Sequence, residues 1–139
     1  MRADEIMSPD VIAVRATQTV AEAVEVLVER GFRHLPVLGD AGQLVGILSD
    51  RDLRALGVSM TLDERAREKV EERMRAPVAR LMSTGVATVR PDTELPEIID
   101  TMLEAGVGAV PVVDDDSDAL LGIVSYVDVL RAVRETAEA

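Results

Sequence analysis

The sequence contains no cysteine and no tryptophan, and its aromatic side chains are limited to one phenylalanine and one tyrosine. Without cysteine the chain forms neither disulfide bonds nor thiolate metal sites. With so few aromatic rings it offers no stacking platform for single-stranded nucleic acid. A single histidine and no serine–histidine–acid set that plainly converges also argue against catalysis. We therefore expect a protein that is not an enzyme and that has neither catalytic nor metal-binding residues.

Positive charge is scarce as well. Fifteen Lys and Arg residues face 26 Asp and Glu residues, which gives a formal net charge of −11. Nucleic-acid backbones are bound by clustered Lys and Arg, so this balance argues against DNA or RNA as a partner. No apolar run approaches the roughly 20 residues that cross a bilayer, and the first ten residues carry acids where a signal peptide has basic and then apolar residues. We predict a cytoplasmic protein without membrane contact.

What the sequence does contain is an internal repeat. A shift of 75 places superimposes Met7-Ser8 on Met82-Ser83. The heptapeptide GILSDRD at Gly46 returns as GIVSYVD at Gly122, after one extra residue in the second copy. Each copy is too small to bury its apolar face well, so we expect the two to pack together. The predicted organisation is a first repeat at 1–57, a charged linker helix at 58–76 and a second repeat at 77–139.

Both copies predict the element order β-α-β-β-α, and hence an α/β fold. Thr19 and Glu22 have the spacing of a capping box at the start of a helix, and Gly31 and Gly106 stand where a helix ends. The predicted elements are strands at 11–14, 35–38, 44–48, 86–89, 110–113 and 120–124, each pair of hairpin strands being followed by a helix, at 52–56 and 128–134.

The predicted helices carry apolar stripes at helical spacing. The first stripe contains Val20, Ala23, Val24, Leu27 and Val28, and the second contains Leu95, Ile98, Ile99, Met102 and Leu103. In the linker, a thinner stripe consists of Leu62, Ala66, Val70 and Met74. We interpret the linker as a solvated surface helix. A partner-docking helix is the alternative, with weaker support.

The repeated motif combines a glycine, a serine and an aspartate. Ser49 and Ser125 end strands and open helices, where free backbone N–H groups and the helix dipole favour an anion, and Asp52 and Asp128 follow three residues later. A carboxylate at that place is a fitting partner for a vicinal diol. The same Ser-x-x-Asp spacing is also that of a plain helix cap with an acidic third residue. Its recurrence in both copies, each time after a glycine, favours a binding function.

The two copies resemble a tandem cystathionine-beta-synthase (CBS) domain pair, also called a Bateman module. The segments that carry the resemblance are IMSPDVIAV, RHLPVL and LVGILSDRDL in the first copy and LMSTGVATV, VGAVPVVD and LLGIVSYVDVL in the second. The family is regulatory and includes many small stand-alone bacterial proteins. The resemblance implies two β-α-β-β-α repeats with pseudo-two-fold symmetry, whose clefts bind adenine nucleotides. AMP, ADP or ATP are the implied regulatory ligands, S-adenosylmethionine or NAD are less favoured, and no cofactor is obligatory.

The resemblance also implies roles for individual residues. In the family motif, the Asp carboxylate accepts hydrogen bonds from ribose hydroxyls and the Ser hydroxyl approaches phosphate, while Arg33 and His34 occupy places that often contact phosphate. The second copy has Gly108 and Ala109 at those two places, so we expect unequal sites, with the one served by Arg33 dominant. The full predicted ligand site contains Ser49, Asp52, Ser125, Asp128, Arg33, His34, Gly46, Gly122, Ile12, Ala13, Pro36, Ala87, Thr88 and Pro111.

The remaining expectations concern assembly and one acidic turn. We predict a homodimer because short helices present the apolar residues Leu53, Leu56, Val129, Leu130 and Val133. The alternative to ligand sensing is a ligand-free dimerisation module, and an unidentified effector protein is a further expected partner. The segment DDDSD at 114–118 lacks the glycine and the distant glutamate of a calcium loop, so we interpret it as a solvated hairpin turn.

Overall fold

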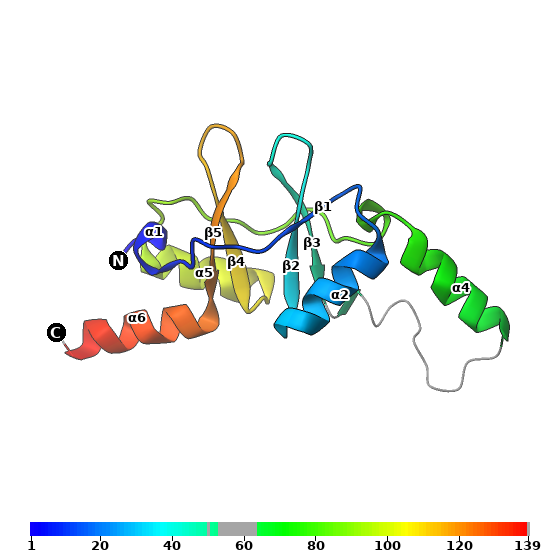
Figure 1. Cartoon of the computed structure of the whole chain (residues 1–139). Helices are drawn as coiled ribbons and strands as arrows, with labels where there is room; N and C mark the ends of the chain where they lie inside the picture. Colours follow the sequence, from blue (N-terminus) through cyan, green and yellow to red (C-terminus); the bar gives the residue numbers. More distant parts are fainter. Residues whose placement is uncertain (50, 53–63, 139) are drawn as a thin grey trace. The chain divides into compact units, whose positions relative to one another are not determined.

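The computed structural model describes residues 1–49, 51–52 and 64–138 (Figure 1). The chain forms two compact units. Unit 1 consists of Met1–Val11, Ala41–Leu44 and Ala87–Ala139, and unit 2 consists of Ile12–Asp40 and Val45–Val86. The predicted helix at 52–56 lies outside the described residues apart from its start.

Unit 2 contains a three-stranded sheet in the order β1-β2-β3. The short strand β1 runs parallel to β2, with Val14 opposite Val37. Buried aliphatic side chains of the strands and of α2 form one core. The elements are β1 (Val14–Arg15), α2 (Val20–Arg30), β2 (His34–Leu38), β3 (Leu44–Ser49, whose Leu44 belongs to unit 1), α4 (Glu64–Arg75) and the 3-10 turn η1 (Val78–Arg80).

Unit 1 contains a two-stranded antiparallel hairpin in which Ala109 lies opposite Ser125 and Val110 opposite Val124. Its core gathers Ile98 and Met102 from the preceding helix with the strand valines. The elements are α1 (Ala3–Ile6), α5 (Leu95–Ala105), β4 (Ala109–Val113), β5 (Leu120–Ser125) and α6 (Tyr126–Glu138). None of the helices in the described ranges is long and apolar enough to span a bilayer.

The helix ends follow the sequence signals closely. Gly31 and Gly106 end α2 and α5 in the left-handed conformation, at φ 65° and 66°. Thr19 caps α2 by accepting a hydrogen bond from the Glu22 amide at 3.2 Å. The Glu22 carboxylate accepts a hydrogen bond from the Gln18 side chain. The expected C-caps are thus confirmed, as is the serine/threonine half of the predicted capping box.

In each copy, the predicted apolar stripe includes one residue that the structure leaves exposed. Val28 is 76% exposed and Leu103 is 74% exposed, whereas both were expected to face the core. The buried residues of α2 are Val20, Ala23 and Leu27. A turn of α-helix has 3.6 residues, so a helix lying on one sheet buries a narrow face, and a residue directly after Leu27 is rotated out of it.

The first predicted strand of each copy is shorter than expected. In the first copy β1 begins only at Val14, and in the second Val89 forms a single parallel bridge with Val112. The preceding residues Ile12, Ala13, Ala87 and Thr88 are half-buried but lie outside strands. The cause in the first copy is connectivity, because Ser8 pairs with β5 of unit 1 and Val14 with β2 of unit 2, so the chain between them connects two sheets.

Each unit is completed by a short segment from the other sequence repeat. Ser8, from the first repeat, pairs with Ile123 through two backbone hydrogen bonds of 2.9 and 3.0 Å. Ser83, from the second repeat, pairs with Ile47 through bonds of 2.8 and 3.0 Å. The compact units therefore exchange these segments relative to the repeats in the sequence, whose boundaries stay a prediction.

The motif glycines Gly46 and Gly122 leave room for the exchanged segments to lie against the strands. A Cβ atom on Gly46 would lie 2.5 Å from Met82 Sδ and 3.0 Å from the Ser83 carbonyl oxygen. A Cβ atom on Gly122 would likewise meet the Met7 sulfur and lie 2.9 Å from the Ser8 carbonyl oxygen. Glycine fits these two places because the methionine side chain and the crossing backbone leave too little room for a Cβ atom unless they shift.

We expect Gly46→Ala to lower the free energy of unfolding by about 1–3 kcal/mol, the usual range for an overpacked core. The matched control is Gly108→Ala, whose Cβ would meet Tyr126 at an ordinary 3.6 Å. Urea denaturation of both variants measures the difference. Equal midpoints for Gly46→Ala and wild type would show that the Met82 segment gives way without cost.

The charged linker helix is described over α4, which packs against α2 (Figure 1). Val70 and Met74, two members of its predicted stripe, are half-buried. Leu62 lies outside the described residues. The predicted surface helix is therefore present and is anchored to unit 2 along one side.

Candidate functional site

Each Ser-x-x-Asp motif forms a closed hydrogen-bonded cap. In the first copy Asp52 Oδ2 accepts hydrogen bonds from the Ser49 amide at 2.8 Å and from Ser49 Oγ at 3.0 Å, while the Asp52 amide donates to Ser49 Oγ at 3.3 Å. Ser125 and Asp128 repeat this geometry at 2.8, 3.0 and 3.3 Å. The cap interpretation of the motif is confirmed, and it uses one carboxylate oxygen in each copy.

The second carboxylate oxygen distinguishes the two copies. Asp52 Oδ1 accepts a hydrogen bond of 2.9 Å from Ser83 Oγ. In the second copy the corresponding serine is Ser8, and within the described ranges its hydroxyl does not bond to Asp128. Asp128 Oδ1 accepts no hydrogen bond from any described residue, and the residue is only half-buried. Asp128 is therefore held in place by its cap while one oxygen remains available to a donor.

Ser83 is the polar contact of the motif that the sequence interpretation did not include. The sequence did mark Ser83 as a repeated residue, because Met7-Ser8 and Met82-Ser83 match in the repeat. What the sequence does not indicate is that Met82-Ser83 crosses to β3 of the other repeat, where it reaches Asp52.

Arg33 and His34 stand at the entry of β2, next to the motif. β2 and β3 are hydrogen-bonded neighbours connected by a short turn, so the start of β2 lies beside the end of β3, where Ser49 is found. Arg33 is exposed, and its guanidinium forms no ion pair with another described residue. The equivalent Gly108 is in contact with Tyr126, whose amide donates to its carbonyl at 2.9 Å. The structure thus brings a cation to the first motif alone at these positions.

The other predicted site residues lie deeper. Pro36 and Pro111 are fully buried in the strands. Gly46 and Gly122 are buried beneath Met82 and Met7. The prediction that these glycines admit a ligand stays untested; the close approach seen here is with a methionine.

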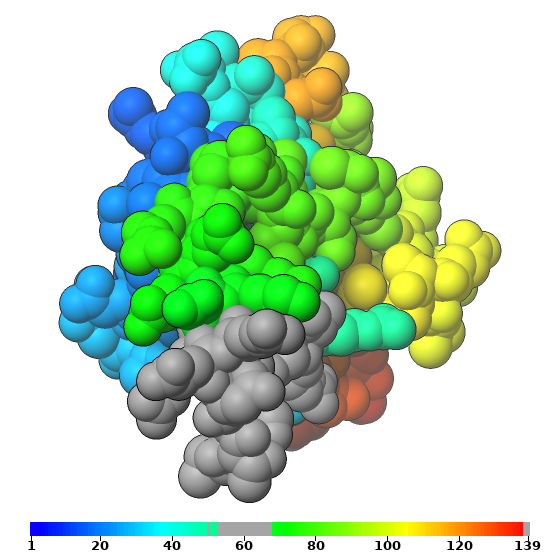
Figure 2. All heavy atoms as spheres, turned by 90° about the vertical axis from the view of Figure 1, so that its right-hand side faces the viewer, coloured from blue at the N-terminus to red at the C-terminus, as the bar shows by residue number. Residues whose placement is uncertain are grey.

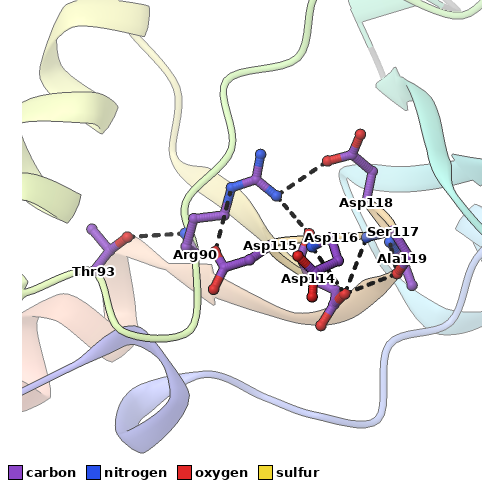
Figure 3. Close-up of polar contacts among 8 residues, drawn as sticks. All are labelled: Arg90, Thr93, Asp114, Asp115, Asp116, Ser117, Asp118 and Ala119. Atoms are coloured by element: carbon purple, nitrogen blue, oxygen red, sulfur yellow. Dashed lines mark hydrogen bonds and ion pairs between the residues drawn. The ribbon is translucent and has the colours of Figure 1, made fainter.

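The acidic turn after β4 is organised by protein groups (Figure 3). Asp114 Oδ2 accepts hydrogen bonds from the Ser117 amide and hydroxyl and from the Asp116 amide, at 3.0–3.2 Å. Arg90 donates to the Asp114 carbonyl at 2.6 Å and to Asp118 Oδ1 at 3.1 Å. The described residues contain no cluster of acids or histidines that would hold a metal ion. The interpretation of this segment as a hairpin turn is confirmed. Arg90, which the sequence analysis did not single out, holds the turn in place.

The hydrogen bonds from Ser117, followed by the one from Asp116 and by the charge of Arg90, lower the pKa of Asp114. A carboxyl whose folded pKa is lowered stabilises the fold above its unfolded pKa of about 3.9 and loses that contribution as the pH falls through the folded value. We expect Asp114→Asn to be less stable than wild type at pH 7, with the gap narrowing as the pH falls below the unfolded pKa of about 3.9. Urea titrations at pH 7 and in acid measure the gap. Asp116→Asn is the control in the same turn, and a gap that does not change with pH would contradict the assignment.

The comparison with known proteins identifies the family. The CBS domain matches residues 3–58 and again residues 78–135. The chain belongs to the CBS domain family. As a tandem pair of CBS repeats with an α/β fold, it agrees with the resemblance drawn from the motifs.

Two named proteins illustrate what this chain is similar to. CBSX2 from Arabidopsis thaliana is 30% identical, with a TM-score of 0.82 and coverage of 99% of this chain and 97% of that one. Its structure in complex with AMP is also 30% identical, with a TM-score of 0.80 and coverage of 98% of both chains. Inosine-5'-monophosphate dehydrogenase from Methanocaldococcus jannaschii is 32% identical over 94% of this chain. The chain spans only 23% of that relative's length.

Proposed function

We propose that this CBS pair is a regulatory module that binds an adenine nucleotide through its Ser-x-x-Asp motifs. The observation that carries the proposal is the Asp128 carboxylate, which the Ser125 cap fixes by one oxygen while the other stays available. A ribose diol is the matching donor pair. Support from outside the chain is that CBSX2, 30% identical over 98% of both chains, has been seen in complex with AMP.

The phosphate requires cations rather than backbone amides alone. Of the first three amides of α6, the one of Tyr126 donates to the Gly108 carbonyl and the one of Asp128 donates to Ser125 Oγ. The Val127 amide is thus the one left for an anion at this helix start. Arg33 supplies a permanently charged, forked donor set that suits a phosphate group. In unit 2 the phosphate contact is therefore assigned to Arg33, beside the first motif.

A thermal-shift screen with AMP, ADP, ATP, S-adenosylmethionine and NAD tests the proposal. A ligand that binds only the native state stabilises it by about 2.7 kcal/mol at a hundredfold excess over Kd, which raises the midpoint by several degrees. We expect AMP, ADP or ATP to raise it most. If none of the five shifts the midpoint at millimolar concentration, the ligand-free dimerisation module is the better account.

We further propose that the module forms a homodimer through α6. Leu130 is 62% exposed and Val133 is 44% exposed, as predicted, and Tyr126 on the same helix is 60% exposed. Val129 corrects the prediction, because it is only 9% exposed and packs in the core of unit 1. Leu53 and Leu56 lie outside the described residues. Exposed apolar side chains grouped on one helix are typical of an interface.

We expect light scattering at tens of micromolar, a range that covers interfaces of roughly micromolar Kd, to give a dimer mass. Leu130→Asp should shift the mass to that of a monomer, because it places a charge in an apolar contact. Arg131→Asp is the control, since it introduces an aspartate at an exposed polar position of α6 and changes the net charge by even more, −2 against −1. A monomeric wild type, or equal behaviour of the two variants, would contradict the interface.

A further inference from the structure

A hollow of about 530 Å³ lies within unit 2, and none of its lining residues belongs to a Ser-x-x-Asp motif. It is bounded by α4, by the start of α2 and by η1, and residues of α4 and η1 lie on the face that Figure 2 turns toward the viewer. Its polar lining consists of Lys69, Glu72, Arg73 and Arg80, and its apolar lining includes Val20 and Leu81. The volume falls within the range of about 300–1,000 Å³ typical of small-molecule sites.

Three cations converge on this hollow from two elements. Lys69 and Arg73 are four residues apart on α4, which places them on one face of the helix, and Arg80 comes from η1. Like charges at that helical spacing repel each other. Glu72 contributes the one carboxylate of the lining. The hollow therefore carries excess positive charge although the whole chain has a net charge of −11.

Two of these cations are available to a ligand. Among the described residues, Lys69 and Arg80 form neither an ion pair nor a side-chain hydrogen bond, and both side chains belong to exposed residues. Arg73 adds its charge to the hollow while it makes an interaction of its own. Positive charge that no described residue pairs with, placed in a concave surface, attracts and retains anions.

The start of α2 adds to the same field. α2 is an eleven-residue helix whose first residue, Val20, lines the hollow. The N-terminus of a helix carries about half a positive charge. The Val20 amide donates to the Ala76 carbonyl at 2.9 Å, which ties the start of α2 to the end of α4. The apolar side of the hollow, from Val20 and Leu81, suits the non-polar part of an organic molecule.

We propose that this hollow is a second binding site, which takes a small phosphate-bearing organic anion. Arginine and lysine together match a phosphate group, because the guanidinium binds two of its oxygens and the ammonium acts as a point charge. The site shares no residue with the Ser-x-x-Asp motifs. It is therefore distinct from the proposed nucleotide site. A molecule bound here contacts α4, the helix between the two CBS repeats.

Titration with inorganic pyrophosphate, followed by NMR amide shifts at low ionic strength, tests the site. We expect saturable shifts at the amides of Val20, Lys69 and Leu81. The variant Lys69→Gln with Arg80→Gln should bind at least tenfold more weakly, since each charge-assisted contact that is lost accounts for that much. Arg75→Gln is the matched control, an exposed cation of α4 that does not line the hollow.

The circular dichroism of each variant is compared first, and the single variants replace the double variant if it does not fold. Absence of shifts in the wild-type chain at millimolar pyrophosphate would overturn the site, as would equal weakening by Arg75→Gln. Asp128→Ala should leave pyrophosphate binding unchanged. Nucleotide stabilisation without pyrophosphate shifts at the hollow would remove this site and leave the proposed function intact.

Discussion

Replacing Asp128 by alanine should weaken AMP binding tenfold to about a hundredfold. The available Asp128 oxygen is the acceptor proposed for a ribose hydroxyl, and a hydrogen bond to a charged group contributes about 1.5–3 kcal/mol. A loss of 1.4 kcal/mol is a factor of ten in Kd. Calorimetry with AMP on wild type and variant measures the change directly.

The substitution also removes part of a helix cap, so its effect on folding must be separated from its effect on binding. Asp128 accepts two hydrogen bonds from Ser125, and losing a cap costs about 1 kcal/mol of stability. Thr19→Ala is the matched control, because it removes the cap of α2 at a distance in sequence from the motif. An Asp128→Ala protein that is less stable yet binds AMP like wild type would show that the motif is only a cap.

The effect of Asp52→Ala on AMP binding is compared with that of Asp128→Ala, because the two residues occupy the same place in the two copies. The sequence does not decide between Asp52 and Asp128 as the ribose partner, and Asp52 is only the first guess. The Ser83 hydroxyl already donates to Asp52 Oδ1 at 2.9 Å, so a ribose hydroxyl must share that oxygen or displace Ser83. On the geometry we expect Asp52→Ala to weaken AMP binding less than Asp128→Ala.

Arg33→Ala should weaken nucleotide binding by a similar factor, ten to about a hundred, through loss of one cation–phosphate contact of about 1.5–3 kcal/mol. A nucleotide brings negative charge to a chain that already carries −11, so the site must supply a local cation. Arg33 is exposed and forms no ion pair among the described residues. Adenosine, which has no phosphate, should bind wild type and Arg33→Ala equally.

Arg30→Ala is the control for a general change in charge, since Arg30 is an exposed cation in the last turn of α2. It should alter the AMP affinity by less than twofold. The stoichiometry is a second readout, because Gly108 and Ala109 bring no charge to the second copy. Two equal AMP sites in wild type, or an unchanged affinity of Arg33→Ala, would mean that the asymmetry in sequence is not one of function.

Local signals in the sequence predicted local structure well. Glycines at Gly31 and Gly106 ended helices as expected, and the Ser-x-x-Asp spacing produced caps in both copies. These features depend on a few neighbouring residues, whose steric and hydrogen-bonding preferences decide the outcome. The repeat also led to the family, because the order of motifs is preserved in both copies.

Features that depend on residues far apart in the sequence were not predictable in the same way. The exchange of Ser8 and Ser83 between repeats involves isolated backbone bridges, which have no periodic pattern of their own. Arg90 reaches the acidic turn 24 residues later, and nothing in its surroundings marks it for that role. The exposure of Val28 and Leu103 likewise depends on how narrow a helix face the sheet covers. Tertiary packing decides each of these.

The most direct test of the central claim is a calorimetric titration of AMP into the wild-type chain, at protein concentrations that give a measurable heat. The account predicts saturable binding that Asp128→Ala weakens and Thr19→Ala leaves unchanged. The contradicting result is no saturable heat with AMP, ADP or ATP at millimolar concentration, from a protein that is folded and dimeric in the same buffer.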